Sequence, residues 1–370
     1  MGISNPFNVD ATNCTDSDLA LLSARGGALI KSFCGLDEPA KDWDERALCV
    51  LKARKGFGKS HLLLLRSLNH RASDAANRTL FYPQGGRVSR PIDALGALHV
   101  VIPRWLQGRE AVGAWTGIWQ LAILGLLVWI TRSEPKSLAG YSAWFGSLAQ
   151  REGEHPPVML TLFLAQVVQE LDSEDFATGM SKLNQGLFDA EKYWGSAVRL
   201  SIEARNRSRI ALYLDSPDEL VGLDQPGVWR NIQQSLLLAI WIFSKKSEWS
   251  KMLNIYASVR SEAFGSGHDH PDVQMAMGFV IKLFYNRDEL EAMLDDRIRQ
   301  ADPAMLALPL TESVKPVESL CGFSKVQHDE RSMPEGGIYC EGIFDSILRH
   351  TRLVPREVIG ISSSTLPARN

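Results

Sequence analysis

The sequence predicts an α/β fold with a five-stranded parallel sheet, a large helical insertion and a small helical lid. Two segments carry this prediction. Residues 46–67 pass from an apolar run through a glycine-containing turn into a leucine-rich helical pattern, and residues 209–214 form a second apolar run that ends at Asp215. Strands that are covered on both faces are apolar almost throughout, so both runs fit strands of a buried parallel sheet.

The remaining elements follow from periodicity and from breaks at proline and glycine. Strands are expected at residues 99–103, 253–260 and 278–284, and a helix at residues 287–299. We therefore expect the following organisation: an N-terminal helical segment at 1–44, a core at 45–300 that contains a helical insertion at about 105–207, a helical lid at 301–361 whose last helix covers 342–350, and a polar tail at 362–370.

The turn at residues 53–60, ARKGFGKS, matches a phosphate-binding loop in which Ala53 replaces the first glycine. Gly56 and Gly58 allow backbone conformations in which successive N–H groups point at phosphate oxygens, and Lys59 adds a positive charge. The Ser60 hydroxyl is expected to bind Mg²⁺ between the β- and γ-phosphates. The candidate nucleotide-binding residues are Ala53, Gly56, Phe57, Gly58, Lys59, Ser60 and His61.

A phosphate loop needs a second element, an apolar strand that ends in an aspartate able to hold the magnesium ion. Asp215 fills this role at the end of the 209–214 run, as a magnesium ligand beside Ser60. Asp218 and Glu219 follow three and four residues later, where a carboxylate can polarise the attacking water. The sequence does not rank the two, although Glu219 is slightly favoured.

The apolar strand, Asp215, the small Ser216 and the pair Asp218-Glu219 resemble the magnesium motif of NACHT-like members of the STAND class of signalling ATPases, which are P-loop NTPases related to AAA+ proteins. Pro217 departs from the apolar residue usual in that family. The resemblance covers most of residues 45–300 and rests on three short motifs.

The family resemblance assigns roles to two arginines. Arg260 ends the alternating run at 253–260 and resembles the sensor that detects the γ-phosphate, so we expect it to act in catalysis with Lys59. Arg356 follows Pro355 in an element that resembles the Pro-Arg segment of the lid in related ATPases, which implies a second sensor.

The resemblance implies an ATP-binding and ATP-hydrolysing switch that uses Mg²⁺, forms homo-oligomers and regulates a separate effector, such as a nuclease or a nucleotide deaminase, in bacterial antiphage defence. Two other interpretations stay open: a nucleotide-locked scaffold that never hydrolyses ATP, and a nucleic-acid-handling ATPase of the replication-initiator kind. The last predicts a basic groove or a winged helix, and the basic stretches at 66–78 and 199–209 are modest.

Composition limits the partners. Forty Lys and Arg against 43 Asp and Glu give a net charge of −3, so no global field attracts nucleic acid or an anionic membrane. Five scattered cysteines and the absence of a secretory signal in the first residues favour the cytoplasm.

Residues 111–130 carry no charge and are long enough to span a bilayer, but a crossing there would separate the two halves of one nucleotide site. We therefore expect a buried helix and no contact with a membrane.

Overall fold

The fold is described from a computed structural model, whose described residues are 48–60, 62–63, 66, 79–80, 100–131, 138–148, 156–172, 175–203, 210–215, 226–264, 270–299, 303–330, 337–349, 351 and 358. The expected N-terminal segment at 1–44 and the tail at 362–370 lie outside these residues.

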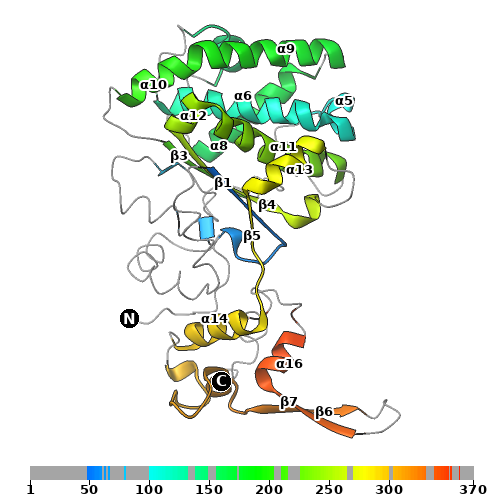
Figure 1. Ribbon diagram of the computed structural model, residues 1–370, viewed down its shortest axis with the longest axis vertical. Helices are drawn as coiled ribbons and strands as arrows, with labels where there is room; N and C mark the ends of the chain where they lie inside the picture. The colour runs from blue at the N-terminus through cyan, green and yellow to red at the C-terminus, as the bar shows by residue number, and fades with distance from the viewer. Residues whose placement is uncertain are drawn as a thin grey trace.

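The centre of the molecule is a parallel sheet with the order β2-β3-β4-β1-β5 (Figure 1). Its strands are β1 (Leu48–Ala53), β3 (Ile210–Leu214), β4 (Leu253–Arg260) and β5 (Val280–Lys282), with the two-residue β2 (Thr79–Leu80) at one edge. All four neighbouring pairs are parallel. The α/β class and the strands predicted around residues 46–53, 209–214, 253–260 and 278–284 are confirmed, although β5 is shorter than expected.

One predicted strand is wrong. Residues 100–103 are not in a strand, and they lead instead into α5 (Arg104–Gln107), with Pro103 at its N-cap. The edge position next to β3 is held by β2, whose Thr79 and Leu80 pair with Ala211 and Leu212. The short apolar run at 100–102 is compatible with a strand, but Pro103 has no N–H to give to a ladder and has the fixed φ that suits the start of a helix.

The connections of the sheet place two hydrophobic cores on its opposite faces. The connections from β2 to β3, from β3 to β4 and from β4 to β5 all run toward the β5 edge of the sheet. The connection from β1 to β2 runs toward the β2 edge. Right-handed crossovers therefore put these two sets of connections on different faces. Val50, Leu212 and Ile255 face the first core, and Leu51, Tyr213 and Tyr256 face the second.

The helical insertion covers the first face. It contains α5, the turn η3 (Arg109–Ala111), α6 (Val112–Thr131), α7 (Tyr141–Phe145), α8 (Pro156–Glu170), α9 (Phe176–Asp189), the π-helical turn η5 (Ala190–Trp194) and α10 (Gly195–Glu203). Between this layer and the sheet lies α11 (Pro226–Lys245), which contacts β1 and β4 on one side and α6 on the other. Then α12 (Ser247–Met252) leads into β4, and η7 (Ser261–Ala263), α13 (Pro271–Ala276) and η8 (Met277–Phe279) connect β4 to β5.

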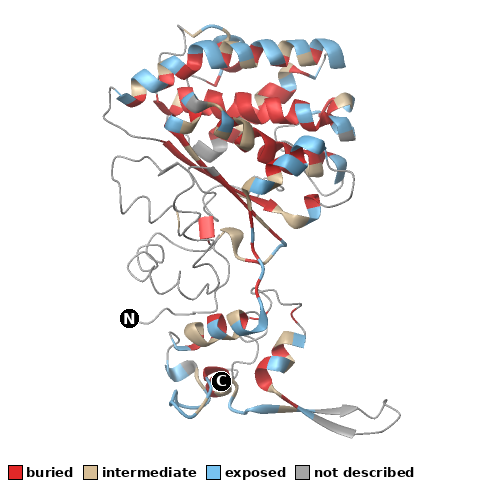
Figure 2. Ribbon diagram, in the orientation of Figure 1, coloured by how far each residue is buried: buried red, intermediate tan, exposed pale blue. Residues whose placement is uncertain are grey.

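Helix α6 is the charge-free segment that the sequence singled out. It is long and apolar enough to cross a membrane, yet 89% of its most apolar 18-residue window is buried inside the protein. Figure 2 shows α6 buried along most of its length. Trp119 Nε1 donates to the Ile232 carbonyl of α11 at 3.0 Å, and Trp115 is equally buried. A helix packed on several sides by α8, α9, α10 and α11 is apolar all round because it is a core helix. The prediction of a buried helix is confirmed, and the fold is compatible with a soluble protein.

The C-terminal unit continues the second core. It consists of α14 (Arg287–Arg299), η9 (Pro303–Met305), α15 (Pro316–Cys321), the antiparallel hairpin of β6 (Lys325–Glu330) and β7 (Gly337–Gly342), and α16 (Ile343–Arg349). The predicted helices at 287–299 and 342–350 are confirmed. The region expected to form a helical lid also contains a β-hairpin at residues 325–342, which was not predicted (Figure 1).

Candidate functional site

The predicted phosphate-binding loop lies at the carboxyl end of β1, and we call residues 53–60 the glycine loop. Gly56 has φ = 89° and Gly58 has φ = 78°, both in the left-handed region that favours glycine. Helical structure begins at Lys59, and the Leu62 N–H donates to the Gly58 carbonyl at 3.0 Å. The strand–loop–helix arrangement predicted from the sequence is thus confirmed in the described residues, with the two glycines in the conformations that a loop of converging N–H groups requires.

Lys59 folds back over the start of this loop. Its Nζ donates to the carbonyl oxygens of Ala53 and Arg54, each at 3.0 Å. The ammonium group therefore spans the loop from its helical end to its strand end. Arg54 and Lys55 are exposed on the same short segment, so the loop carries three positive charges within six residues. Such a segment attracts a polyanion.

Asp215 and Arg260 approach the glycine loop from two neighbouring strands. Strand β4 lies directly between β1 and β3, and Arg260 is the register partner of Ala53, the first loop residue. Asp215 follows β3 and is tied to β4, because the Ser258 hydroxyl donates to Asp215 Oδ1. Two strand spacings, about 10 Å, separate β1 from β3.

The three strands also present these residues on one face. Side chains alternate along a strand, so Asp215 shares the face of Tyr213, and Arg260 shares that of Tyr256. Both tyrosines belong to the second core, as do Leu62 and Leu63 of the helix that follows the glycine loop. The predicted metal ligand, the predicted sensor and the loop helix therefore lie on the same side of the sheet.

Strand order also explains why the predicted ligand-binding residues collect at this edge. The connections that leave β1 and β4 depart to opposite faces, as the two cores show, which makes this neighbouring pair a topological switch point. In open parallel sheets ligands bind outside the carboxyl ends of the strands at such points.

Sequence reasoning missed Ser258 and Gln233. Ser258 is 1% exposed and lies two residues before Arg260 in β4, so the two side chains point to the same face of the sheet. The alternating run at 253–260 could have indicated this. Gln233 of α11 accepts the Arg260 N–H at 2.6 Å, and the neighbouring Gln234 donates to the Ala263 carbonyl at 2.8 Å. Two adjacent glutamines of α11 thus hold both ends of the turn that follows β4.

The donor set fits Mg²⁺ in kind. Ser60 and Asp215 offer hard oxygen atoms, and Mg²⁺ is usually held by one or two carboxylates together with water and phosphate oxygens. Among the described residues no group of three or more His, Cys, Asp or Glu side chains is close enough to hold a metal ion.

Four predicted site residues lie outside the described residues: His61, Asp218, Glu219 and Arg356. The others, namely Ala53, Gly56, Phe57, Gly58, Lys59, Ser60, Asp215 and Arg260, are all at the carboxyl ends of β1, β3 and β4 or in the loop between β1 and its helix.

Comparisons of the chain with protein-family models, with curated proteins and with solved structures find no significant match. The structure by itself defines an α/β protein with a parallel sheet and a glycine loop at its switch point.

Proposed function

We propose that the protein is a cytoplasmic molecular switch that binds ATP with Mg²⁺ at the glycine loop and hydrolyses it. The observation that carries the proposal is the pair of positive φ angles at Gly56 and Gly58, in a loop that Lys59 closes and that joins a buried strand to a helix. A loop with these glycine conformations at the start of a helix can offer backbone N–H groups to an anion, and the Lys59 ammonium adds a positive charge beside it, which suits a chain of phosphates.

Each residue has a part in this proposal. The glycine loop and Lys59 hold the phosphate chain, and Ser60 and Asp215 hold Mg²⁺, which supplies charge neutralisation between the β- and γ-phosphates. Arg260 lies beside the loop start and adds positive charge near the terminal phosphate. Asp218 or Glu219 polarises the attacking water, and Arg356 responds to the nucleotide from the lid. Homo-oligomerisation, a separate effector protein and antiphage defence enter the proposal through the STAND-class resemblance alone.

The experiment compares Lys59→Met with Lys55→Met, an equal loss of charge at an exposed position of the same loop. Binding of ATP with Mg²⁺ is measured by calorimetry, phosphate release is followed over time, and mass in solution is recorded with and without nucleotide. Lys59→Met should lose ATP binding and phosphate release, whereas Lys55→Met should keep both. Wild-type hydrolysis in Lys59→Met would refute the site, and binding without any phosphate release by the wild type would favour the scaffold.

The replication-initiator interpretation gains nothing from the C-terminal hairpin. A hairpin after a short helix is the arrangement of a winged helix, but residues 325–342 contain two Lys or Arg against four Asp or Glu. A net negative wing repels the DNA backbone, so salt-dependent DNA binding is not expected from this element.

A further inference from the structure

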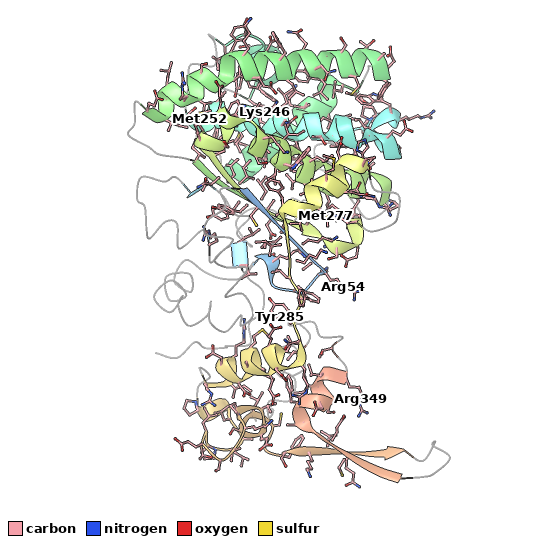
Figure 3. The ribbon with its side chains drawn as sticks, in the orientation of Figure 1. Arg54, Lys246, Met252, Met277, Tyr285 and Arg349 are labelled. Atoms are coloured by element: carbon pink, nitrogen blue, oxygen red, sulfur yellow. The ribbon has the colours of Figure 1, made fainter. Side chains whose placement is uncertain are left out.

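Tyr285 joins the glycine loop to the C-terminal unit. It lies in the short connection between β5 and α14, where the Leu283 N–H donates to the Lys52 carbonyl of β1 at 3.0 Å and so extends the sheet. The Tyr285 side chain is buried, with 6% exposure, and its hydroxyl donates to the Phe57 carbonyl at 3.2 Å (Figure 3). The rings of Tyr285 and Phe57 also pack together, with 5.9 Å between their centroids.

The bonded carbonyl lies between the two left-handed glycines, and this location gives the hydrogen bond a specific effect. The carbonyl of Phe57 and the N–H of Gly58 belong to one planar peptide unit, and in a trans peptide they point in opposite directions. A donor that holds the carbonyl on the core side of the loop therefore turns the Gly58 N–H toward the other side. Glycine restricts its own backbone less than any other residue, so peptide planes beside Gly56 and Gly58 depend on such outside contacts for their orientation.

We propose that Tyr285 is a positioning residue for phosphate binding, because its hydroxyl fixes the peptide between Phe57 and Gly58 with the Gly58 N–H directed at the bound anion. The inference rests on the proposed function, since the anion is the phosphate chain of a nucleotide. It adds a residue from outside the loop, 228 positions along the chain from Phe57.

The start of α14 ties this hydroxyl to the C-terminal unit. Asn286 and Glu289 form a reciprocal capping box, in which the Asn286 N–H donates to Glu289 Oε2 at 2.7 Å and the Glu289 N–H donates to Asn286 Oδ1 at 2.9 Å. Tyr285 immediately precedes this box, so a movement of α14 moves the phenol. By linkage, phosphate binding at the loop then favours the placement of α14 that leaves the Tyr285 bond intact.

The chain offers a closely matched control. Tyr141 of α7 is fully buried and donates its hydroxyl to the Gly125 carbonyl at 3.2 Å, within the helical insertion on the other face of the sheet. Tyr285→Phe and Tyr141→Phe each remove one buried phenol-to-carbonyl bond and keep the ring. Affinities for ADP, ATP and inorganic pyrophosphate with Mg²⁺ are measured by calorimetry, and melting temperatures establish that both variants are folded.

Tyr285→Phe should weaken pyrophosphate and ADP binding by the same factor, about three- to tenfold, while Tyr141→Phe leaves both affinities unchanged. Amide hydrogen exchange provides a readout that needs no ligand, and exchange in residues 56–59 should accelerate in Tyr285→Phe alone. Unchanged affinity together with unchanged exchange would overturn the inference. If the wild type binds none of the three compounds, the proposed function fails, and amide hydrogen exchange alone then tests whether Tyr285 positions the loop. Faster exchange in residues 56–59 of Tyr285→Phe, and not of Tyr141→Phe, supports the positioning role. Equal exchange in the two variants overturns it.

Discussion

The hydroxyl of Ser258 donates to Oδ1 of Asp215, which connects the carboxyl end of β3 to the neighbouring strand β4 near its own carboxyl end. Ser258 is the register partner of Leu51 in β1, two residues before the glycine loop. The carboxylate proposed to bind magnesium is therefore positioned by the strand that also carries Arg260. A hydrogen bond from a neutral hydroxyl stabilises an ionised carboxylate and restricts its rotamer, and both effects favour metal binding.

Removal of this hydroxyl should weaken magnesium use. In Ser258→Ala the Mg²⁺ concentration that half-saturates ATP binding should rise about three- to tenfold, because Asp215 loses a charge-assisted hydrogen bond. Ser258→Thr keeps a hydroxyl and should stay close to wild type. Ser235→Ala serves as a control, since Ser235 is equally buried but donates to the Ile232 carbonyl of its own helix. A normal magnesium requirement in Ser258→Ala would show that the bond has no part in metal binding.

Gln233 gives a second test, at Arg260. Its Oε1 accepts a hydrogen bond from the Arg260 N–H. Arg260 lies beyond the part of β4 that pairs with β3, because the last residue of β3 is opposite Ala257. Gln233→Leu removes this side-chain acceptor, so the end of β4 should shift or fray. We expect a fall of about tenfold in phosphate release, with ATP affinity changed less, because Arg260 is proposed to act on the terminal phosphate. Gln233→Glu retains the acceptor and should recover part of the rate. An equal loss of affinity and rate in Gln233→Leu would indicate general damage to the site.

The sequence predicted the loop and the strand ends because their chemistry is local. Gly56, Gly58, Lys59 and Ser60 are adjacent in the chain, and Asp215 and Arg260 each end a strand whose apolar pattern is visible without tertiary information. Strand order is not local. That β4 lies between β1 and β3 depends on how the insertion and α11 pack on one face. Tyr285 has no local signal at all, since its partner Phe57 is far away in sequence.

The wrong strand and the missed hairpin have related causes. Residues 99–103 contain a short β-branched apolar run typical of a strand, but pairing at the sheet edge decides which segment becomes a strand, and β2 takes that place. The hairpin at 325–342 was missed because its strands are rich in polar and charged residues, as in Gln327, Asp329 and Glu341. A two-stranded ribbon at the surface has no buried pattern of alternation to reveal it.

The insertion supplies a test of packing. A Cβ placed on Gly125 of α6 would lie 2.5 Å from the Phe145 ring, which is itself fully buried against Phe163 and Trp194. Gly125→Ala should therefore destabilise the protein by about 1–3 kcal/mol through overpacking. On the same helix, nothing lies within 4 Å of a Cβ at Gly113, so Gly113→Ala should be neutral or slightly stabilising. Denaturant unfolding midpoints of the two variants measure this difference in stability. Equal midpoints would refute the close packing of α6 on α7.

Asp295 of α14 provides a test of pH dependence in the C-terminal unit. Burial, with a smaller contribution from Glu291, raises the pKa of Asp295 to about 6, although Arg299 and Lys315 oppose the shift. Its Oδ1 is buried and has no hydrogen-bond partner. A carboxyl whose pKa is higher in the folded state than in the unfolded state stabilises the fold when protonated, and this contribution is lost as pH rises from about 4 through about 6.

Replacement of Asp295 by asparagine removes the charge that the folded protein has to bury above pH 6. Asp295→Asn should therefore melt at a higher temperature than wild type at pH 7.5, and most of the gain should disappear at pH 4, where the carboxyl is protonated in the folded state and about half protonated in the unfolded state. Asp288→Asn, at an exposed position of the same helix, should give no gain at pH 7.5. Melting curves at the two pH values measure the difference. A gain of equal size at both pH values would mean that shape or packing, and not the buried charge of Asp295, accounts for the stabilisation.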